Sequence, residues 1–108
     1  MNKSAMVGIW SKNTGAVVSN REAYLGEPEE LGKILSDLFS TPREALRASI
    51  LGIYCDKDPD NAMVFKNIID FLVKSNTDYM YLYDGIGWFV ATKKDRNFEE
   101  LDRLLLTL

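Results

Sequence analysis

The chain has 108 residues, of which 46% are hydrophobic and 27% charged, with a formal net charge of -3, one cysteine and no histidine. These values predict one folded domain over residues 1–108 and exclude an intrinsically disordered protein. The negative charge argues against nucleic acid as a partner, and a single cysteine cannot form an internal disulfide. We expect a cytoplasmic protein, because no apolar run is long enough for a signal sequence or a membrane span.

The first quarter of the chain predicts a β-hairpin followed by a helix. Residues 5–10, "AMVGIW", favour a strand, and the turn residues of "KNTG" separate it from a second strand over residues 16–19. From Pro28 to Phe39 the apolar residues recur at the helical period, and a proline suits the first turn of a helix.

A second helix is expected directly afterwards. Thr41 is placed to cap its N-terminus, Pro42 suits its first position, and Glu44 is spaced for a reciprocal bond with the cap. Gly52 would end this helix in the left-handed conformation. The following "IYC" leaves two alternatives, a short strand or a buried linker, and Cys55 is expected as a buried structural thiol.

An aspartate-rich segment comes next. Asp56, Asp58 and Asp60 have the spacing of the first three ligands of a calcium loop. The loop is incomplete, because Asn61 stands where the motif needs glycine and Asn67 where it needs a bidentate glutamate. We therefore expect no metal site and no cofactor, and interpret the segment as a solvated turn whose Asp60 caps the next helix.

Two more helices are predicted after residue 60. The first has a wide apolar face, formed by Val64, Phe65, Ile68, Ile69, Phe71 and Leu72. The second occupies "NFEELDRLLLTL", where Asn97 and Glu100 would form an N-terminal cap pair. Its apolar stripe consists of Leu101, Leu104, Leu105 and Leu108.

A tyrosine-rich hairpin is predicted between these two helices. The dipeptide "DG" at residues 84–85 indicates a tight turn, with a loop of two residues or of four, "DGIG". Both loop lengths are even and therefore place the same residues on each face, whereas a loop of three residues would mix the two faces. One face carries Tyr79, Tyr81, Tyr83, Trp88 and Val90, and the other carries Met80, Leu82, Phe89 and Ala91.

The aromatic face allows two interpretations. The opposite face belongs on the core, since its side chains carry no polar atom apart from one sulfur. Tyrosine and tryptophan combine an apolar body with a polar tip, so their face forms either a second core layer under a helix or a contact surface for a protein partner. The candidate binding residues are Tyr79, Tyr81, Tyr83 and Trp88, together with the acidic cluster Glu27, Glu29 and Glu30.

No catalytic residues are assigned. The absence of histidine removes the commonest general base and every nucleophile that histidine activates. The glutamates at residues 27–30 are explained by a favourable interaction with a helix N-terminus. A small enzyme that uses carboxylates without histidine is the alternative, and a concave site with converging carboxylates would distinguish it from a binding module.

Two segments, "YLGEPEELGKIL" and "YLYDGIGWFV", resemble a family of small phage and bacterial proteins of unknown activity. That family carries the motif "CHWDGYPEHVGKIL" and a tyrosine-rich hairpin before a final leucine-rich helix. Where the motif has Cys, His, Trp and Asp, this chain has Glu22, Ala23, Tyr24 and Leu25, so chemistry that needs the His and Asp would be absent. The resemblance implies an α+β fold and a phage or mobile-element origin, and it implies no activity.

Hairpins interleaved with helices predict the α+β class, with an antiparallel sheet built from two hairpins and about four helices packed on it. The core is expected to include Leu35, Ile68, Phe71, Leu82, Phe89, Leu101 and Leu105. We expect a small acidic, non-catalytic protein that binds a protein partner, such as a phage-derived inhibitor whose acidic groups, including Asp56, Asp58 and Asp60, mimic phosphates. A homo-oligomeric structural protein that hides the aromatic face against a second copy is a further alternative.

Overall fold

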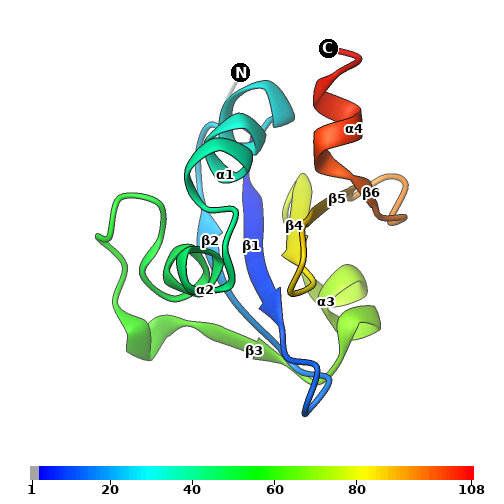
Figure 1. Ribbon diagram of the computed structural model, residues 1–108. Coiled ribbons are helices and arrows are strands. Elements are labelled where there is room, and N and C mark those ends of the chain that lie inside the picture. The colour runs from blue at the N-terminus through cyan, green and yellow to red at the C-terminus, as the bar shows by residue number, and fades with distance from the viewer. Residues whose placement is uncertain (1–2) are drawn as a thin grey trace.

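Six strands form one sheet in the computed structural model, which describes residues 3–108 (Figure 1). The order of the strands is β3-β2-β1-β4-β5-β6. The strands are β1 (Ala5–Trp10), β2 (Val17–Glu22), β3 (Met63–Phe65), β4 (Tyr79–Tyr83), β5 (Trp88–Thr92) and β6 (Glu99–Glu100). The helices are α1 (Lys33–Leu38), α2 (Pro42–Leu51), α3 (Ile68–Lys74) and α4 (Leu101–Leu105), with a π-helical turn at Pro28–Gly32 and a 3-10 turn at Pro59–Asn61.

The α+β class is confirmed, but the sheet is mixed rather than antiparallel. Both predicted hairpins form, β1 with β2 and β4 with β5. The two hairpins then join through β1 and β4, which pair in parallel with Ala5 opposite Tyr79 and Ile9 opposite Tyr83. The prediction of an antiparallel sheet was wrong because the segments between the hairpins return the chain to the end of the sheet at which β1 begins.

Helices cover both faces of the sheet. Residues of α1, α2 and α4, among them Leu35, Ala48 and Leu101, pack on one face. The other face is covered by α3, whose Phe71 meets Phe65 of β3 edge to face with ring centroids 5.5 Å apart. In Figure 1, α1 and α2 lie over β1 and β2, and α3 lies near the end of β3.

The predicted core is partly right. Four of the residues expected in the core are buried, namely Leu35, Phe71, Leu82 and Leu101. The other three are only half-buried, namely Ile68, Phe89 and Leu105. Phe89 lies on β5, one strand in from the edge of the sheet, and Ile68 and Leu105 lie at the ends of short helices.

Part of the predicted cap forms at the start of α2, whereas the predicted glycine cap at its end does not. Thr41 Oγ1 accepts a hydrogen bond from the N–H of Glu44 at 3.2 Å, which is one half of the predicted reciprocal cap. Gly52 follows α2 with φ 82° and ψ 165°, so φ is positive but the residue is not in the left-handed helical conformation that was predicted. The helix predicted over residues 28–39 begins as a π-helical turn, and regular α-helix starts only at Lys33.

The segment around β3 differs most from the prediction. Met63–Phe65 forms an edge strand on β2 instead of the first turn of a helix. Asn67 caps α3, accepting a hydrogen bond from the N–H of Asp70 at 2.7 Å. Asp60 lies in the 3-10 turn, where its N–H is bound by Asp58 Oδ1 at 2.9 Å. The apolar residues of this short segment fit the spacing of a helix, but the segment pairs with β2 instead. Spacing along the sequence gives no information on such a distant partner.

The final helix is shorter than predicted. α4 begins at Leu101, directly after β6. Asn97 donates its side-chain N–H to Asp95 Oδ1 at 3.2 Å instead of capping the helix. Leu101 is buried whereas Leu108 is 61% exposed, so the leucine stripe is covered only at its beginning. Among residues 3–108, no helix is long and apolar enough to cross a membrane.

Candidate functional site

The aromatic face of the β4–β5 hairpin lies in the core. Its four-residue loop places Tyr83 opposite Trp88 and Tyr81 opposite Val90, which confirms the predicted grouping of side chains. Tyr81, Tyr83 and Trp88 expose only 0%, 1% and 5% of their surface. Of the two interpretations, the core layer is therefore the one that holds for these three side chains, because residues of α1, α2 and α4 pack over them and leave no contact surface. Only Tyr79, at the start of β4, is partly exposed.

Backbone carbonyls of the covering segments satisfy the polar tips of this face. Tyr81 donates its hydroxyl proton to the carbonyl of Gly26 at 2.7 Å. Trp88 Nε1–H donates to the carbonyl of Phe39 at 2.8 Å. The hydroxyl of Tyr83 donates to the carbonyl of Ser40, just before α2, at 3.2 Å. Burial also raises the pKa of Tyr81, so its hydroxyl stays protonated. The side chains therefore act as hydrogen-bonded core residues.

The acidic cluster lies at the start of the π-helical turn. Glu29 and Glu30 are exposed, and Glu27 is half-buried. A hydrogen bond with Glu29 raises the pKa of Glu27 above its ordinary value. No side-chain hydrogen bond caps the turn, and the neighbouring carboxylates disfavour the ionised form of Glu27, so the predicted stabilisation by the helix N-terminus is not seen for this residue.

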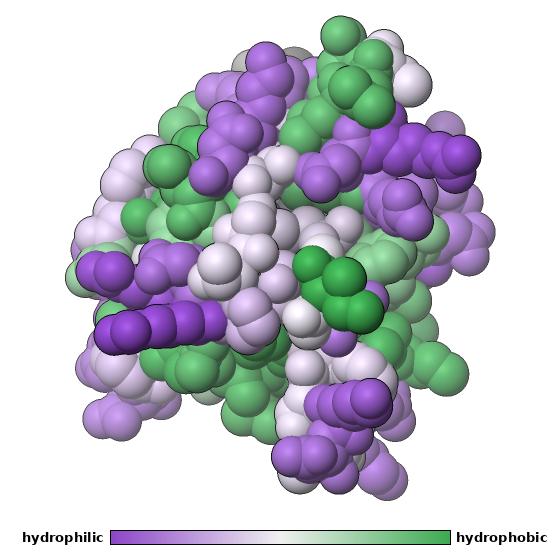
Figure 2. Space-filling model, viewed as in Figure 1, coloured by the Kyte–Doolittle hydropathy of each residue, from purple (hydrophilic) through white to green (hydrophobic). Residues whose placement is uncertain are grey.

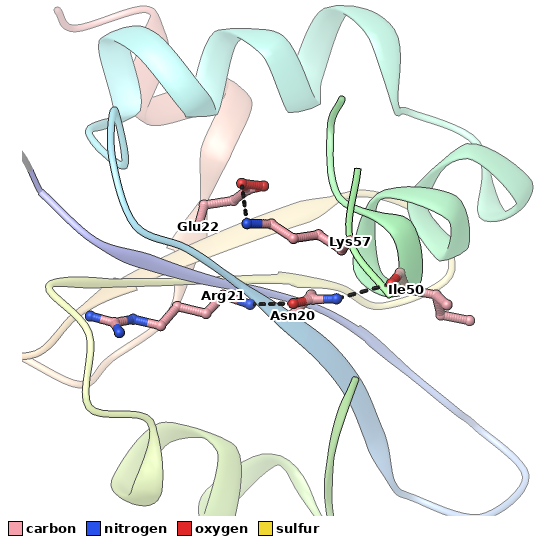
Figure 3. Close-up of polar contacts among 5 residues, drawn as sticks. All are labelled: Asn20, Arg21, Glu22, Ile50 and Lys57. Atoms are coloured by element: carbon pink, nitrogen blue, oxygen red, sulfur yellow. Dashed lines mark hydrogen bonds and ion pairs between the residues drawn. The ribbon is translucent and has the colours of Figure 1, made fainter. Parts of the chain in front are cut away.

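Glu22, at the end of β2, is a buried carboxylate that the sequence did not single out (Figure 3). Its Oε1 lies 3.9 Å from Nζ of Lys57, and its Oε2 is buried without a hydrogen-bond partner. Burial raises the pKa of Glu22, Lys57 opposes that shift, and Asp56 adds to it. No signal marked this residue, because the predicted strand ended at Ser19 and burial here depends on the distant loop that covers β2.

Asn20 connects the same strand to α2. Its Nδ2–H donates to the carbonyl of Ile50 at 2.9 Å, and its Oδ1 accepts from the N–H of Arg21 at 2.9 Å (Figure 3). With Glu22 and Lys57, Asn20 thus holds the end of α2 and the following loop against β2. The cluster is well suited to fixing this loop, and the side chain of Glu22 is 10% exposed, which leaves little room for a substrate.

Cys55 is exposed rather than buried, contrary to the prediction. It lies in the loop after α2 with a positive φ of 55°. Nε of Arg47 donates to its Sγ at 3.2 Å. The segment "IYC" is neither a strand nor a buried linker, since Tyr54 is 65% exposed. Among residues 3–108, no three His, Cys, Asp or Glu side chains are grouped so that they could hold a metal ion.

The turn of the β4–β5 hairpin projects an apolar side chain into solvent. Ile86 is 89% exposed. Asp84 Oδ1 accepts hydrogen bonds from the N–H groups of Ile86 and Gly87, both at 2.9 Å, and Gly85 supplies the positive φ that the turn requires. The isoleucine is therefore held on an ordered turn rather than on a free loop.

A depression of about 430 Å³ lies beside this turn. We call it the tip surface, and it is lined by Asp84, Ile86, Gly87, Trp88, Phe89, Glu100 and Asp102. Its apolar part comes from the hairpin, and its three carboxylates come from the turn and from the β6–α4 junction. Figure 2 shows strongly hydrophobic surface in the region of the β4–β5 turn, with hydrophilic side chains nearby.

Sequence reasoning missed the tip surface although one signal was present. Ile86 stands between Gly85 and Gly87 in a turn, a place where a large apolar side chain has no structural role. Glu100 and Asp102 could not be added, because only the fold brings them beside residue 86. Comparisons of the chain with protein-family models, curated proteins and solved structures found no match, so the resemblance to phage and bacterial proteins stays a prediction.

Proposed function

We propose that the protein is a binding protein that acts by contact with another protein, and that the tip surface forms the contact. The observation that carries this proposal is the exposure of Ile86, at 89%, on a turn fixed by Asp84. Aliphatic and aromatic groups that are rigidly held and surrounded by polar groups supply much of the binding energy at protein interfaces. This surface replaces the aromatic face, which the helices cover.

The charges of the tip surface support a basic partner. Asp84, Glu100 and Asp102 line the depression, and no basic side chain lines it. A complementary partner carries lysine or arginine residues around an apolar hollow that accepts Ile86. A cation above the partly exposed ring of Phe89 would also be stabilised by the aromatic face. Nucleic-acid-binding proteins offer such basic surfaces, which supports the role of an inhibitor that mimics phosphates.

Two further features belong to the proposal. The resemblance of residues 24–35 and 79–105 to phage and bacterial proteins supports a phage origin. The single cysteine, which is exposed and cannot form an internal disulfide, suits a reducing cytoplasm.

A carboxylate-dependent enzyme is the second candidate, because three carboxylates do converge on one depression. Two of them already hold structural hydrogen bonds. Asp84 binds the N–H groups of its own turn, and Asp102 Oδ1 accepts from Ser36 Oγ–H at 2.5 Å. Because acid-base catalysis needs carboxylates with separate protonation states at a reacting group, this arrangement favours binding over catalysis.

The test compares Ile86→Ser with Ile69→Ser. Ile69 lies on α3 and is 70% exposed, so the two variants remove the same side chain from two solvent-facing sites. Both should keep the stability of the parent. Crosslinking in a lysate of the native host, followed by mass spectrometry, should identify a protein that the parent and Ile69→Ser capture equally and that Ile86→Ser loses. A partner that is retained by Ile86→Ser, or the absence of any protein that depends on Ile86, would contradict the proposal.

A further inference from the structure

The opposite end of the β4–β5 hairpin gathers positive charge from distant parts of the chain. Lys3 precedes β1, whereas Lys93 and Lys94 follow β5. The parallel pairing of β1 with β4 and the antiparallel pairing of β4 with β5 align Ala5, Tyr79 and Thr92 across three strands. These pairings bring Lys3 to the same end of the sheet as Lys93 and Lys94, which follow it by 90 residues or more in sequence.

The three lysines line an open depression of about 560 Å³. We call it the basic depression, and it is lined by Lys3, Asp78, Tyr79, Thr92, Lys93 and Lys94. Backbone hydrogen bonds fix its floor, from Tyr79 N–H to the carbonyl of Ser4 at 3.1 Å and from Lys93 N–H to the carbonyl of Asp78 at 3.0 Å. A volume of this size is within the range of small-molecule sites.

The single carboxylate of the basic depression is engaged by its neighbour. Asp78 Oδ2 accepts hydrogen bonds from the N–H of Ser4 at 2.9 Å and from its hydroxyl at 3.2 Å. These bonds lower the pKa of Asp78, so the carboxylate is ionised and bound to the backbone at neutral pH. The charges of Lys3 and Lys93 also lower this pKa, so both lysines lie near the carboxylate. Three lysines and one aspartate line the depression, within a chain that is acidic as a whole.

Two other contacts shape the site. Lys93 Nζ donates to Asn76 Oδ1 at 2.9 Å, a neutral partner that positions the ammonium group without cancelling its charge. Burial raises the pKa of Tyr79, and the carboxylates of Glu27 and Glu29 raise it further, so its hydroxyl remains a hydrogen-bond donor. Since those two glutamates repel an anion on the Tyr79 side, an anion is favoured on the side of the lysines.

The geometry points to a binding site for the phosphate group of a small phosphorylated compound at the basic depression. Lysine ammonium groups are compact, strongly charged donors and are frequent ligands of phosphate in proteins. The ring of Tyr79, stacked on Tyr81 with centroids 6.4 Å apart, provides a flat surface beside the lysines for the organic part of the ligand. This inference concerns the opposite end of the hairpin and is independent of the proposed contact through Ile86.

The test uses inorganic pyrophosphate as the probe. Titration at constant ionic strength, followed by two-dimensional amide NMR, should give saturable shifts confined to residues 3–5, 76–79 and 92–95. The double variant Lys93→Gln with Lys94→Gln should bind at least roughly tenfold more weakly, because it loses two charge-assisted contacts. The matched control, Lys12→Gln with Lys66→Gln, removes the same charge from two exposed lysines elsewhere and should bind as the parent does.

Three results would overturn the inference: no saturable shift at millimolar pyrophosphate, equal affinities of the two double variants, or shifts spread over all lysines. If the double variant is unstable, Lys3→Gln is used in its place, and it should also weaken binding. Ile86→Ser should bind pyrophosphate as the parent does, so failure of the proposed contact and failure of this site are separate outcomes.

Discussion

At the scale of single residues, Tyr81 shows how an aromatic side chain with a polar tip becomes part of a core. Its ring is fully buried between the sheet and the helices, and its hydroxyl reaches the carbonyl of Gly26. Burial of the ring supplies the hydrophobic contribution, and the hydrogen bond removes the cost of burying the hydroxyl and the carbonyl. The parity of the strand predicted which residues accompany Tyr81, but the sequence alone did not predict what covers them.

Tyr81→Ala should lower the free energy of unfolding by about 3–5 kcal/mol, because it removes a fully buried ring from a packed site. Tyr81→Phe should lower it by about 1–2 kcal/mol, since it removes only the hydrogen bond and leaves the Gly26 carbonyl buried. Urea denaturation measures both effects. Tyr54→Phe is the control, because Tyr54 is 65% exposed and its loss of a hydroxyl should change little. A Tyr81→Ala protein that melts within a few degrees of the parent would contradict the burial.

Glu22 makes a pH-dependent contribution that lowers stability at neutral pH. Its pKa is raised mainly by burial, and the attraction of Lys57 does not compensate. The folded protein therefore holds this proton more tightly than the unfolded chain does. As the pH rises above the ordinary pKa of a glutamate, the unfolded chain loses this proton first, so the stability falls until the pH has passed the raised pKa of the folded state.

Glu22→Gln should consequently be more stable than the parent at about pH 7, and this advantage should shrink as the pH falls below about 4, where Glu22 becomes mostly protonated in both states. Urea denaturation across this pH range measures the difference. Glu99→Gln, at an exposed position of β6, should show no such trend. If Glu22→Gln is less stable than the parent at pH 7, the ion pair with Lys57 outweighs the cost of burial.

At the scale of elements, the sequence predicted those features that local chemistry decides. Thr41 and Pro42 set the start of α2, and Asp84 with Gly85 sets the hairpin turn, because each acts on backbone groups within three residues. β3 was missed, since its identity depends on pairing with β2, more than 40 residues earlier. The tip surface and the basic depression escaped prediction for the same reason, as each combines residues from distant segments.

The junction after α2 depends on a glycine. Gly52 has φ 82°, and a Cβ atom there would lie 2.6 Å from Cγ of Lys57. Gly52→Ala should cost about 2–4 kcal/mol, from backbone strain together with displacement of the loop over Glu22. Gly15→Ala is the matched control, because Gly15 has φ 79° with no atom within 4 Å of the added methyl group, and it should cost only about 1 kcal/mol. Thermal melts of both variants measure the difference, and equal losses would show that Lys57 moves aside freely.

At the scale of the whole molecule, β1 is the strand around which both layers are built. It pairs with β2 on one side and with β4 on the other, and the segments joined by the second pairing are 74 residues apart. No local pattern encodes a contact of that separation, so the parallel pair could not be read from the sequence. The α+β class was still predictable, because hairpins and amphipathic helices are local features.

Gly8, in the middle of β1, allows the close approach of α3. An added Cβ would lie 2.7 Å from Cγ1 of Val17 and 3.2 Å from Cε1 of Phe71. Gly8→Ala should therefore cost about 1–3 kcal/mol by overpacking the sheet against the helix. Gly87→Ala, where nothing lies within 4 Å of the added methyl group, should stay within about 0.5 kcal/mol of the parent. Denaturation in urea compares the two, and a neutral Gly8→Ala would mean that α3 shifts without cost.

The strand order has a consequence for dividing the chain. The exposed loop after α2 separates an N-terminal half, which holds β1 and β2, from a C-terminal half, which holds the other four strands (Figure 1). In the sheet, the N-terminal hairpin lies between β3 and β4 of the other half. Two peptides produced by cleavage in this loop would each have unpaired strand edges and only part of the core residues. Only their association would restore the sheet. The protein is therefore a natural candidate for fragment complementation, in which two separately expressed pieces report the encounter of the proteins fused to them.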